Sequence, residues 1–211
     1  MLEALSKFYQ AYHIEHDKYG FVHHRNSKTK YFLTHINKGQ KILDLGCRDG
    51  TLTQSFMEDN VLTGMDIDHN ACEICRDNLG IEVIWHNLNE PLPIADSSYN
   101  IVILSDVLEH VFFAEELLTE IKRVLKPNGF CLGSTPNAYY WTLRLKMLQG
   151  IDLSEYSDQT HVHYYSLASL KKLLENIFTY SEISPYGHNS LTKIYPTLFA
   201  SDFFWKSTKG G

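Results

Sequence analysis

"ILDLGCRDGT", residues 42–51, is the stretch that decides the fold. An apolar run with a single acidic residue leads directly into a turn that is bounded by Gly46 and Gly50. The run predicts a buried strand over residues 41–45. The glycines predict a turn whose backbone can approach a ligand. A helix is expected over residues 51–59, with its free N–H groups facing that ligand.

The alternation of strand and helix continues along the chain. Apolar runs predict strands over 61–66, 81–86, 99–105 and 130–134, and amphipathic or capped segments predict helices over 70–78, 114–125 and 166–176. The segments 178–187 and 201–211 are expected to supply an antiparallel pair of strands. Apolar strands separated by helices indicate an α/β, doubly wound, mostly parallel sheet that is covered on both faces.

Bulk composition narrows the class of protein. A chain of 211 residues with 44% hydrophobic residues is expected to fold as a single domain, and its net charge of −6 argues against nucleic-acid coating. No apolar run approaches the roughly 20 residues of a membrane span, and residues 1–20 lack a signal-peptide core, so a cytoplasmic protein is expected. Cys72 and Cys75 resemble half a zinc site, but without a second pair we interpret them as buried side chains.

Polar residues follow each predicted parallel strand. Gly46 to Gly50 follow the first strand, Asp66 ends the second and Asn87 follows the third. Ser105 and Asp106 end the fourth, and "STPN" (134–137) follows the fifth. The carboxyl ends of parallel strands form the ligand-binding edge of such a sheet. Asp66 lies 20 positions after Gly46, the offset at which an acidic residue accepts hydrogen bonds from ribose. The turn lacks the glycine spacing of dinucleotide binders, which favours S-adenosylmethionine over a nicotinamide dinucleotide.

At this point a resemblance becomes clear. "ILDLGCRDG", "LTGMDID", "NEPLPIADSSYNIVILSDVLEHV" and "EIKRVLKPNGF" resemble the successive motifs of class I S-adenosylmethionine-dependent methyltransferases over residues 40–137. "THVHYYSLASLKKLLE" (160–175) resembles a later stretch of many bacterial members. The resemblance implies a Rossmann-like seven-stranded sheet with an antiparallel last strand. It further implies a helical N-terminal lid (1–38), a cofactor-binding core (39–136) and an acceptor-side cap with the final strands (137–211).

Carried over position by position, the resemblance implies roles for individual residues. The methionine part of the cofactor would be held by Asp44, Gly46, Cys47, Arg48 and Gly50, with Ser105 and Asp106 on the sulfonium side. The nucleoside would be held by Asp66, Ile67, Asn87 and Leu88.

Two positions depart from the family pattern. Arg48 replaces the usual middle glycine, and Asn87 replaces the usual aspartate. We expect Arg48 to keep a negative φ and point away, or to pair with Asp49 or the cofactor carboxylate. An Asn87 amide can still donate and accept at an adenine edge. Cofactor binding is therefore expected to survive both changes.

The acceptor side is expected from residues that follow the core. His110 is a candidate general base, although it can equally be a helix-start residue with structural hydrogen bonds. The pocket wall is predicted from aromatic and histidine residues, with packing of a cap as the alternative: Tyr139, Tyr140, Trp141, Tyr156, His161, His163, Tyr164 and Tyr165. Arg25 is a further candidate for reaching the cofactor carboxylate from the N-terminal segment.

These residues predict a methyltransferase that acts on a small acceptor, with the oxygen of a sugar or related metabolite as the expected site. No metal is expected. Three alternatives stay open. The first is a catalytically degenerate binding or regulatory protein, and the second is a nicotinamide-dependent dehydrogenase. The third is a metal-assisted RNA or quinone-precursor O-methyltransferase, whose arrangement Asp106, Glu109 and His110 with a later histidine resemble. The oligomeric state is not readable from the sequence.

Overall fold

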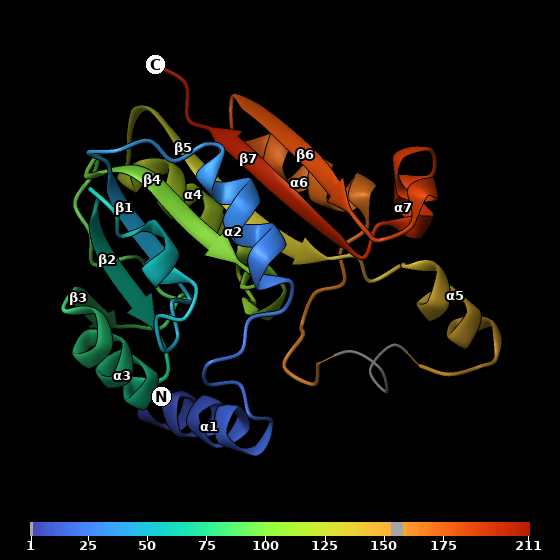
Figure 1. Cartoon of the computed structure of the whole chain (residues 1–211), viewed down its shortest axis with the longest axis horizontal. Coiled ribbons are helices and arrows are strands. Elements are labelled where there is room, and N and C mark those ends of the chain that lie inside the picture. Colours follow the sequence, from blue (N-terminus) through green and yellow to red (C-terminus); the bar gives the residue numbers. More distant parts are fainter. Residues whose placement is uncertain (1, 153–157) are drawn as a thin grey trace.

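The structure is a computed structural model that describes residues 2–152 and 158–211, and its centre is one twisted sheet (Figure 1). The strands follow the order β3-β2-β1-β4-β5-β7-β6. Their bounds are β1 Lys41–Leu45, β2 Val61–Asp66, β3 Glu82–Trp85, β4 Tyr99–Ser105, β5 Leu125–Pro136, β6 Tyr180–Tyr186 and β7 Asp202–Thr208. All pairings are parallel except those of β7, which runs antiparallel to both neighbours. The predicted doubly wound sheet with an antiparallel last strand is confirmed.

Helices flank the sheet and cap its carboxyl edge. The α-helices are α1 Leu2–Glu15, α2 Arg25–Leu33, α3 His69–Leu79, α4 Ala114–Val124, α5 Trp141–Leu148, α6 Leu167–Ile177 and α7 Pro196–Phe199, and the short 3₁₀ turns are η1 Thr53–Phe56, η2 Leu108–His110 and η4 Ser190–Lys193. In the described part of the chain, no helix is long and apolar enough to cross a membrane. In Figure 1, α1 lies beyond the carboxyl ends of β1 and β2, while α5 stands apart from the sheet.

Both faces of the central strands are buried, as an all-apolar strand pattern requires. Ile42 of β1 packs with Phe32 of α2 in one core, and its neighbour Leu43 packs with Leu118 and Leu170 of α4 and α6 in the other. Successive side chains of a strand point to opposite faces. One strand therefore joins both hydrophobic cores and holds its own carboxyl end rigidly.

The expected helix over 51–59 is wrong. Only η1 forms there, so no helix N-terminus faces the turn. The Thr53 hydroxyl donates to Asp44 (2.7 Å), and the Thr51 N–H donates to Asp49 (3.2 Å). Such local side-chain bonds compete with helical hydrogen bonding, and β-branched threonines weaken a short helix further.

The four cysteines, Cys47, Cys72, Cys75 and Cys131, are buried and free. Cys72 and Cys75 on α3 pack with Cys47 and Val83 in a small apolar cluster. The interpretation of the pair as buried side chains is confirmed. α3 ends at Gly80, which has φ +64° and donates its N–H to the carbonyl of Arg76.

Candidate functional site

A cavity of about 570 Å³ opens at the carboxyl ends of the parallel strands. Its walls come from the turn after β1, the end of β2, the segments after β3, β4 and β5, and the N-terminal helix α1. The volume lies within the roughly 300–1,000 Å³ of small-molecule sites. Most of the residues predicted for the cofactor line it: Asp44, Gly46, Cys47, Arg48, Asp66, Ile67, Asn87, Leu88, Ser105 and Asp106.

Gly46 allows the close turn that starts this wall. Its φ is +75°, and a Cβ there would lie 2.3 Å from Cγ2 of Val107. A side chain at this position would therefore strain the backbone and push Val107 away from its place in the wall. Gly50 plays a different part, because a Cβ there would meet Leu79 at 2.6 Å and Cys75 at 2.9 Å. The predicted contact of Gly50 with the ligand is corrected: it packs against α3 and does not line the cavity.

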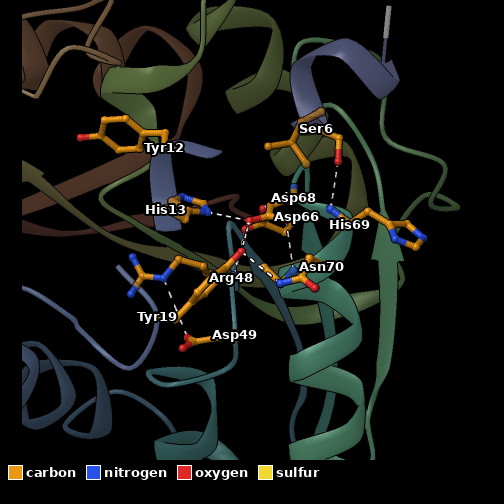
Figure 2. Close-up of polar contacts among 12 residues, drawn as sticks. Ser6, Tyr12, His13, Tyr19, Arg48, Asp49, Asp66, Asp68, His69 and Asn70 are labelled. Carbon is orange, nitrogen blue, oxygen red and sulfur yellow. Dashed lines mark hydrogen bonds and ion pairs between the residues drawn. The ribbon is translucent and has the colours of Figure 1, made fainter. Parts of the chain in front are cut away.

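Arg48 adopts a left-handed backbone with φ +47°, so the expectation of a negative φ is wrong. This conformation turns its N–H toward Asp66, which accepts it at 2.8 Å. Its guanidinium donates to the carbonyl of Phe21, and Nε lies 3.9 Å from Asp49 Oδ1, the pairing drawn in Figure 2. The cation is therefore directed to the segment between α1 and α2 and not into the cavity centre.

Asp66 is a buried carboxylate prepared for further hydrogen bonds. Its two oxygens accept from the N–H groups of Arg48 (2.8 Å) and Asp68 (2.9 Å), which leaves each oxygen a lone pair. Burial raises the pKa of Asp66. Asn87 is also buried, but its carbonyl accepts from Asn89 at 3.1 Å. Asp66 therefore suits a pair of hydroxyls, while Asn87 is already engaged by its own turn.

A second carboxylate, which is partly buried, follows β4. Asp106 has φ +52° and accepts a hydrogen bond from Ser134 (2.6 Å). It also forms an ion pair with Lys28 of α2, whose side chain is fully buried. Burial alone would raise the pKa of Asp106, but the Lys28 charge and the hydrogen bonds from Lys28 and Ser134 together outweigh burial and lower it. At Asp44, burial dominates and raises the pKa to about 7.

Three further groups, from the turn after β4 and the segment before α6, converge on the cavity wall. Glu109, His110 and His161 each offer a ligand or proton-accepting atom within 4.8 Å of the others. Glu109 is 1% exposed, and its Oε2 has no hydrogen-bond partner among the described residues. Burial and then the neighbouring Asp106 raise its pKa. Burial and then His161 lower the pKa of His110 to about 4.

The N-terminal helix is tied down beside Asp66. His13 and the Tyr19 hydroxyl both lie 2.8 Å from Asp68 Oδ2, and the His69 N–H donates to Ser6 at 3.0 Å (Figure 2). Asp68 also caps α3 by accepting from the Ala71 N–H. Because Asp68 follows Asp66 by two residues, the contacts that hold α1 adjoin the proposed ribose carboxylate.

These features fit an adenosine-type cofactor with an amino-acid tail. A glycine turn, a buried carboxylate at the end of β2 and a cavity at the strand ends are what such a ligand requires. The Methyltransferase domain family matches residues 16–177. The chain belongs to this family. It is an S-adenosylmethionine-dependent methyltransferase.

Three similar proteins set the methyltransferase in context. It is 26% identical over 168 residues to a ubiquinone biosynthesis O-methyltransferase of Vibrio atlanticus, covering 74% of this chain and 70% of that one. It is 34% identical over 104 residues to a ubiquinone/menaquinone biosynthesis C-methyltransferase of Haemophilus ducreyi, covering 44% and 40%. A Thermotoga maritima crystal structure described as a possible histamine N-methyltransferase superposes with a TM-score of 0.73 at 15% identity, covering 99% and 100%. The names of these three proteins refer to oxygen, carbon and nitrogen acceptors, so family membership alone does not determine the acceptor atom.

The acceptor wall of the methyltransferase differs from the prediction. His161, His163, Tyr164 and Tyr165 line the cavity. Tyr139, Tyr140 and Trp141 do not, and neither does Arg25. The reason is that Asn137 donates to the carbonyls of Ala200 and Thr197, which directs the following residues outward into α5. Tyr156 lies outside the described residues.

Sequence reasoning missed Lys28 and Asp202. Lys28 lies in "HHRNSKTKY", which reads as an ordinary charged helix, yet its side chain is fully buried. Asp202 begins β7, lines the cavity and is 2% exposed. An acidic residue at the start of a predicted apolar strand is the one available signal for Asp202. Nothing local in the sequence marks Lys28, because only the packing of α2 against the sheet brings it to Asp106.

Proposed function

We propose that this methyltransferase transfers a methyl group to a hydroxyl oxygen of a small acceptor. The observation that carries the proposal is the convergence of Glu109, His110 and His161 on one end of the cavity. A hydroxyl is a weak nucleophile until it loses its proton, so an oxygen acceptor benefits from a positioned base. The name of the Vibrio atlanticus relative, an O-methyltransferase, supports the same acceptor atom.

The tautomer of His110 supports its role as that base. The Thr160 hydroxyl donates to Asp158, so it accepts from His110 Nδ1 at 2.9 Å, and the Thr160 carbonyl can only accept from the same nitrogen, at 3.2 Å. Nδ1 therefore carries the hydrogen, which leaves the Nε2 lone pair for a proton from the acceptor. Because the pKa of His110 is lowered to about 4, the imidazole is neutral near pH 7.

When bound, S-adenosylmethionine supplies an electrophilic methyl carbon on a sulfonium and departs as an uncharged thioether. The residues of the chain hold the acceptor hydroxyl, receive its proton at His110 and limit water in the pocket. The cavity wall also includes the apolar side chains of Val111 and Leu143 and the ring of Tyr165. Such a wall suits a ring-shaped acceptor, either the predicted sugar or a phenol of the quinone-precursor type.

The test is a methyl-transfer assay with a labelled donor against sugars, phenols and catechols, with primary amines as a counter-panel. We expect methylated oxygen in one of the hydroxyl classes. His110→Asn should lower turnover by about 10²-fold or more while S-adenosylmethionine affinity is retained. The matched control is His35→Asn, since His35 lies outside the cavity. Transfer to amines alone, or full turnover by His110→Asn, would refute the proposal.

A second candidate is metal-assisted O-methylation at the same residues. A carboxylate oxygen of Glu109 lies within 4.8 Å of one nitrogen each of His110 and His161, and Glu109 Oε2 has no hydrogen-bond partner among the described residues. This group fits a divalent ion that would polarise the acceptor hydroxyl. Turnover that disappears with a chelator and returns with added Mg²⁺ or Mn²⁺ would favour this candidate. Turnover that is indifferent to both treatments would leave His110 as a plain base.

A further inference from the structure

A second histidine cluster adjoins the cavity and shares no residue with the group of Glu109, His110 and His161. His23 and His24 belong to the link between α1 and α2, and Asp202 begins β7. His24 Nε2 is 3.4 Å from Asp202 Oδ2, and His23 Nδ1 is 3.9 Å from Asp202 Oδ1. One ligand atom from each residue lies within 4.8 Å of the other two. The cluster joins two parts of the chain that are about 180 residues apart in the sequence.

The shorter of the two distances matches the donor spacing of a tetrahedral metal centre. Zinc bonds to imidazole nitrogen and carboxylate oxygen of about 2.0–2.1 Å give donor–donor separations of roughly 3.3–3.4 Å. The His24 contact has this value already. The His23 contact is about half an ångström longer, and its side chain is 59% exposed and free to rotate toward the carboxylate.

Asp202 lacks a permanent cation. Its side chain is 3% exposed, and across residues 2–152 and 158–211 its ion-pair partners are the two imidazoles, which carry charge only when protonated. The nearby Lys28 pairs with Asp106 instead. The remaining close polar partner is the Ser201 hydroxyl, which donates at 2.7 Å. A buried carboxylate without a compensating charge is costly, and a bound cation removes that cost.

We propose that His23, His24 and Asp202 bind a divalent cation of borderline softness, with Zn²⁺ as the best fit to two imidazoles and one carboxylate. Three protein ligands leave one coordination position for water. The ion fastens the link between α1 and α2 to the start of β7. Since His23 and Asp202 both line the cavity, it also closes the rim beside Asp106. This site is distinct from the acceptor end and does not depend on the proposed O-methylation.

The test uses the full chain without a polyhistidine tag, stripped of metal by a chelator. Zn²⁺ is titrated by calorimetry, and Co²⁺ is titrated by its visible ligand-field absorption. We expect one equivalent to bind with a tetrahedral Co²⁺ spectrum. With Zn²⁺ at 100 times its Kd, the thermal midpoint should rise by about 5–10 °C.

Variants locate the ion. Changes beside a metal cost about ten- to a hundredfold in affinity, so loss of a direct ligand in His24→Asn or His23→Gln should weaken Zn²⁺ binding at least about tenfold. Asparagine tolerates the left-handed backbone of His24 (φ +53°), and His23 is exposed, so both variants should fold. His16→Gln, an exposed histidine just after α1, is the matched control and should bind normally.

A variant of the other histidine cluster decides between the two sites. His161→Gln should leave the tetrahedral Co²⁺ spectrum and the Zn²⁺ affinity unchanged. Absence of Zn²⁺ binding would overturn the proposal, as would binding that survives His24→Asn but is lost in His161→Gln. These experiments measure metal binding and not turnover, so failure of the proposed O-methylation would leave the metal-site proposal standing.

Discussion

Lys28→Met tests the ion pair between Lys28 and Asp106, which lines the cavity. Methionine keeps the aliphatic length of lysine and removes only the ammonium. The Lys28 side chain is 0% exposed, while that of Asp106 is 28% exposed and keeps its bond from Ser134. Removing one partner of a buried pair costs about 3–5 kcal/mol. Because Asp106 is partly exposed, we expect Lys28→Met to lower the free energy of unfolding by about 3 kcal/mol, at the lower end of this range. In a chain of this size, that loss lowers the thermal midpoint by about 6–12 °C.

The assay is a double-mutant cycle with Lys28→Met, Asp106→Asn and the combined variant, each followed by urea unfolding. Asparagine tolerates the left-handed φ of +52° at position 106, so this change isolates the charge. In the combined variant no buried charge remains, and the loss of stability should be well below the sum of the single losses. Single effects that add within about 0.5 kcal/mol would refute the reasoning, because independent sites behave in that way.

Three further predictions concern the cavity. The pKa of His110 is lowered to about 4 from an ordinary 6.5, so the native state binds fewer protons than the unfolded chain between these pH values. The free energy of unfolding should therefore fall by up to about 3 kcal/mol as the pH drops from 6.5 to 4. The urea midpoint of His110→Asn should lack this loss. Asp66→Asn should weaken the binding of S-adenosylmethionine, measured by calorimetry, about ten- to a hundredfold, because a hydrogen bond to a charged group is worth about 1.5–3 kcal/mol. Unchanged affinity would show that Asp66 does not bind the ribose. Gly50→Ala should lower stability by about 1–3 kcal/mol without changing S-adenosylmethionine affinity, since Gly50 has φ +81° and packs on α3; reduced affinity in the folded variant would contradict this role.

The local sequence pattern was enough to predict most of the sheet and the residues at the strand ends that line the cavity. Strand 41–45 and its neighbours were readable because a strand buried on both faces must be apolar throughout. Parallel strands then bring their polar carboxyl ends to one edge, so Asp66 and Asp106 could be placed together without any knowledge of distant contacts. Family membership followed from the same ordered motifs.

Tertiary structure decided the features that depend on distant partners. The segment after Gly50 has helical composition, but Thr53 bonds to Asp44 and the helix does not form. Arg48 takes a positive φ because its N–H donates to Asp66 and its guanidinium donates to the carbonyl of Phe21 in the link after α1. Lys28 is buried only because α2 packs against the sheet and presents it to Asp106. Composition and periodicity predict which side of each segment is buried. The partner of a charged side chain depends instead on residues far apart in the sequence, which come into contact only in the folded chain.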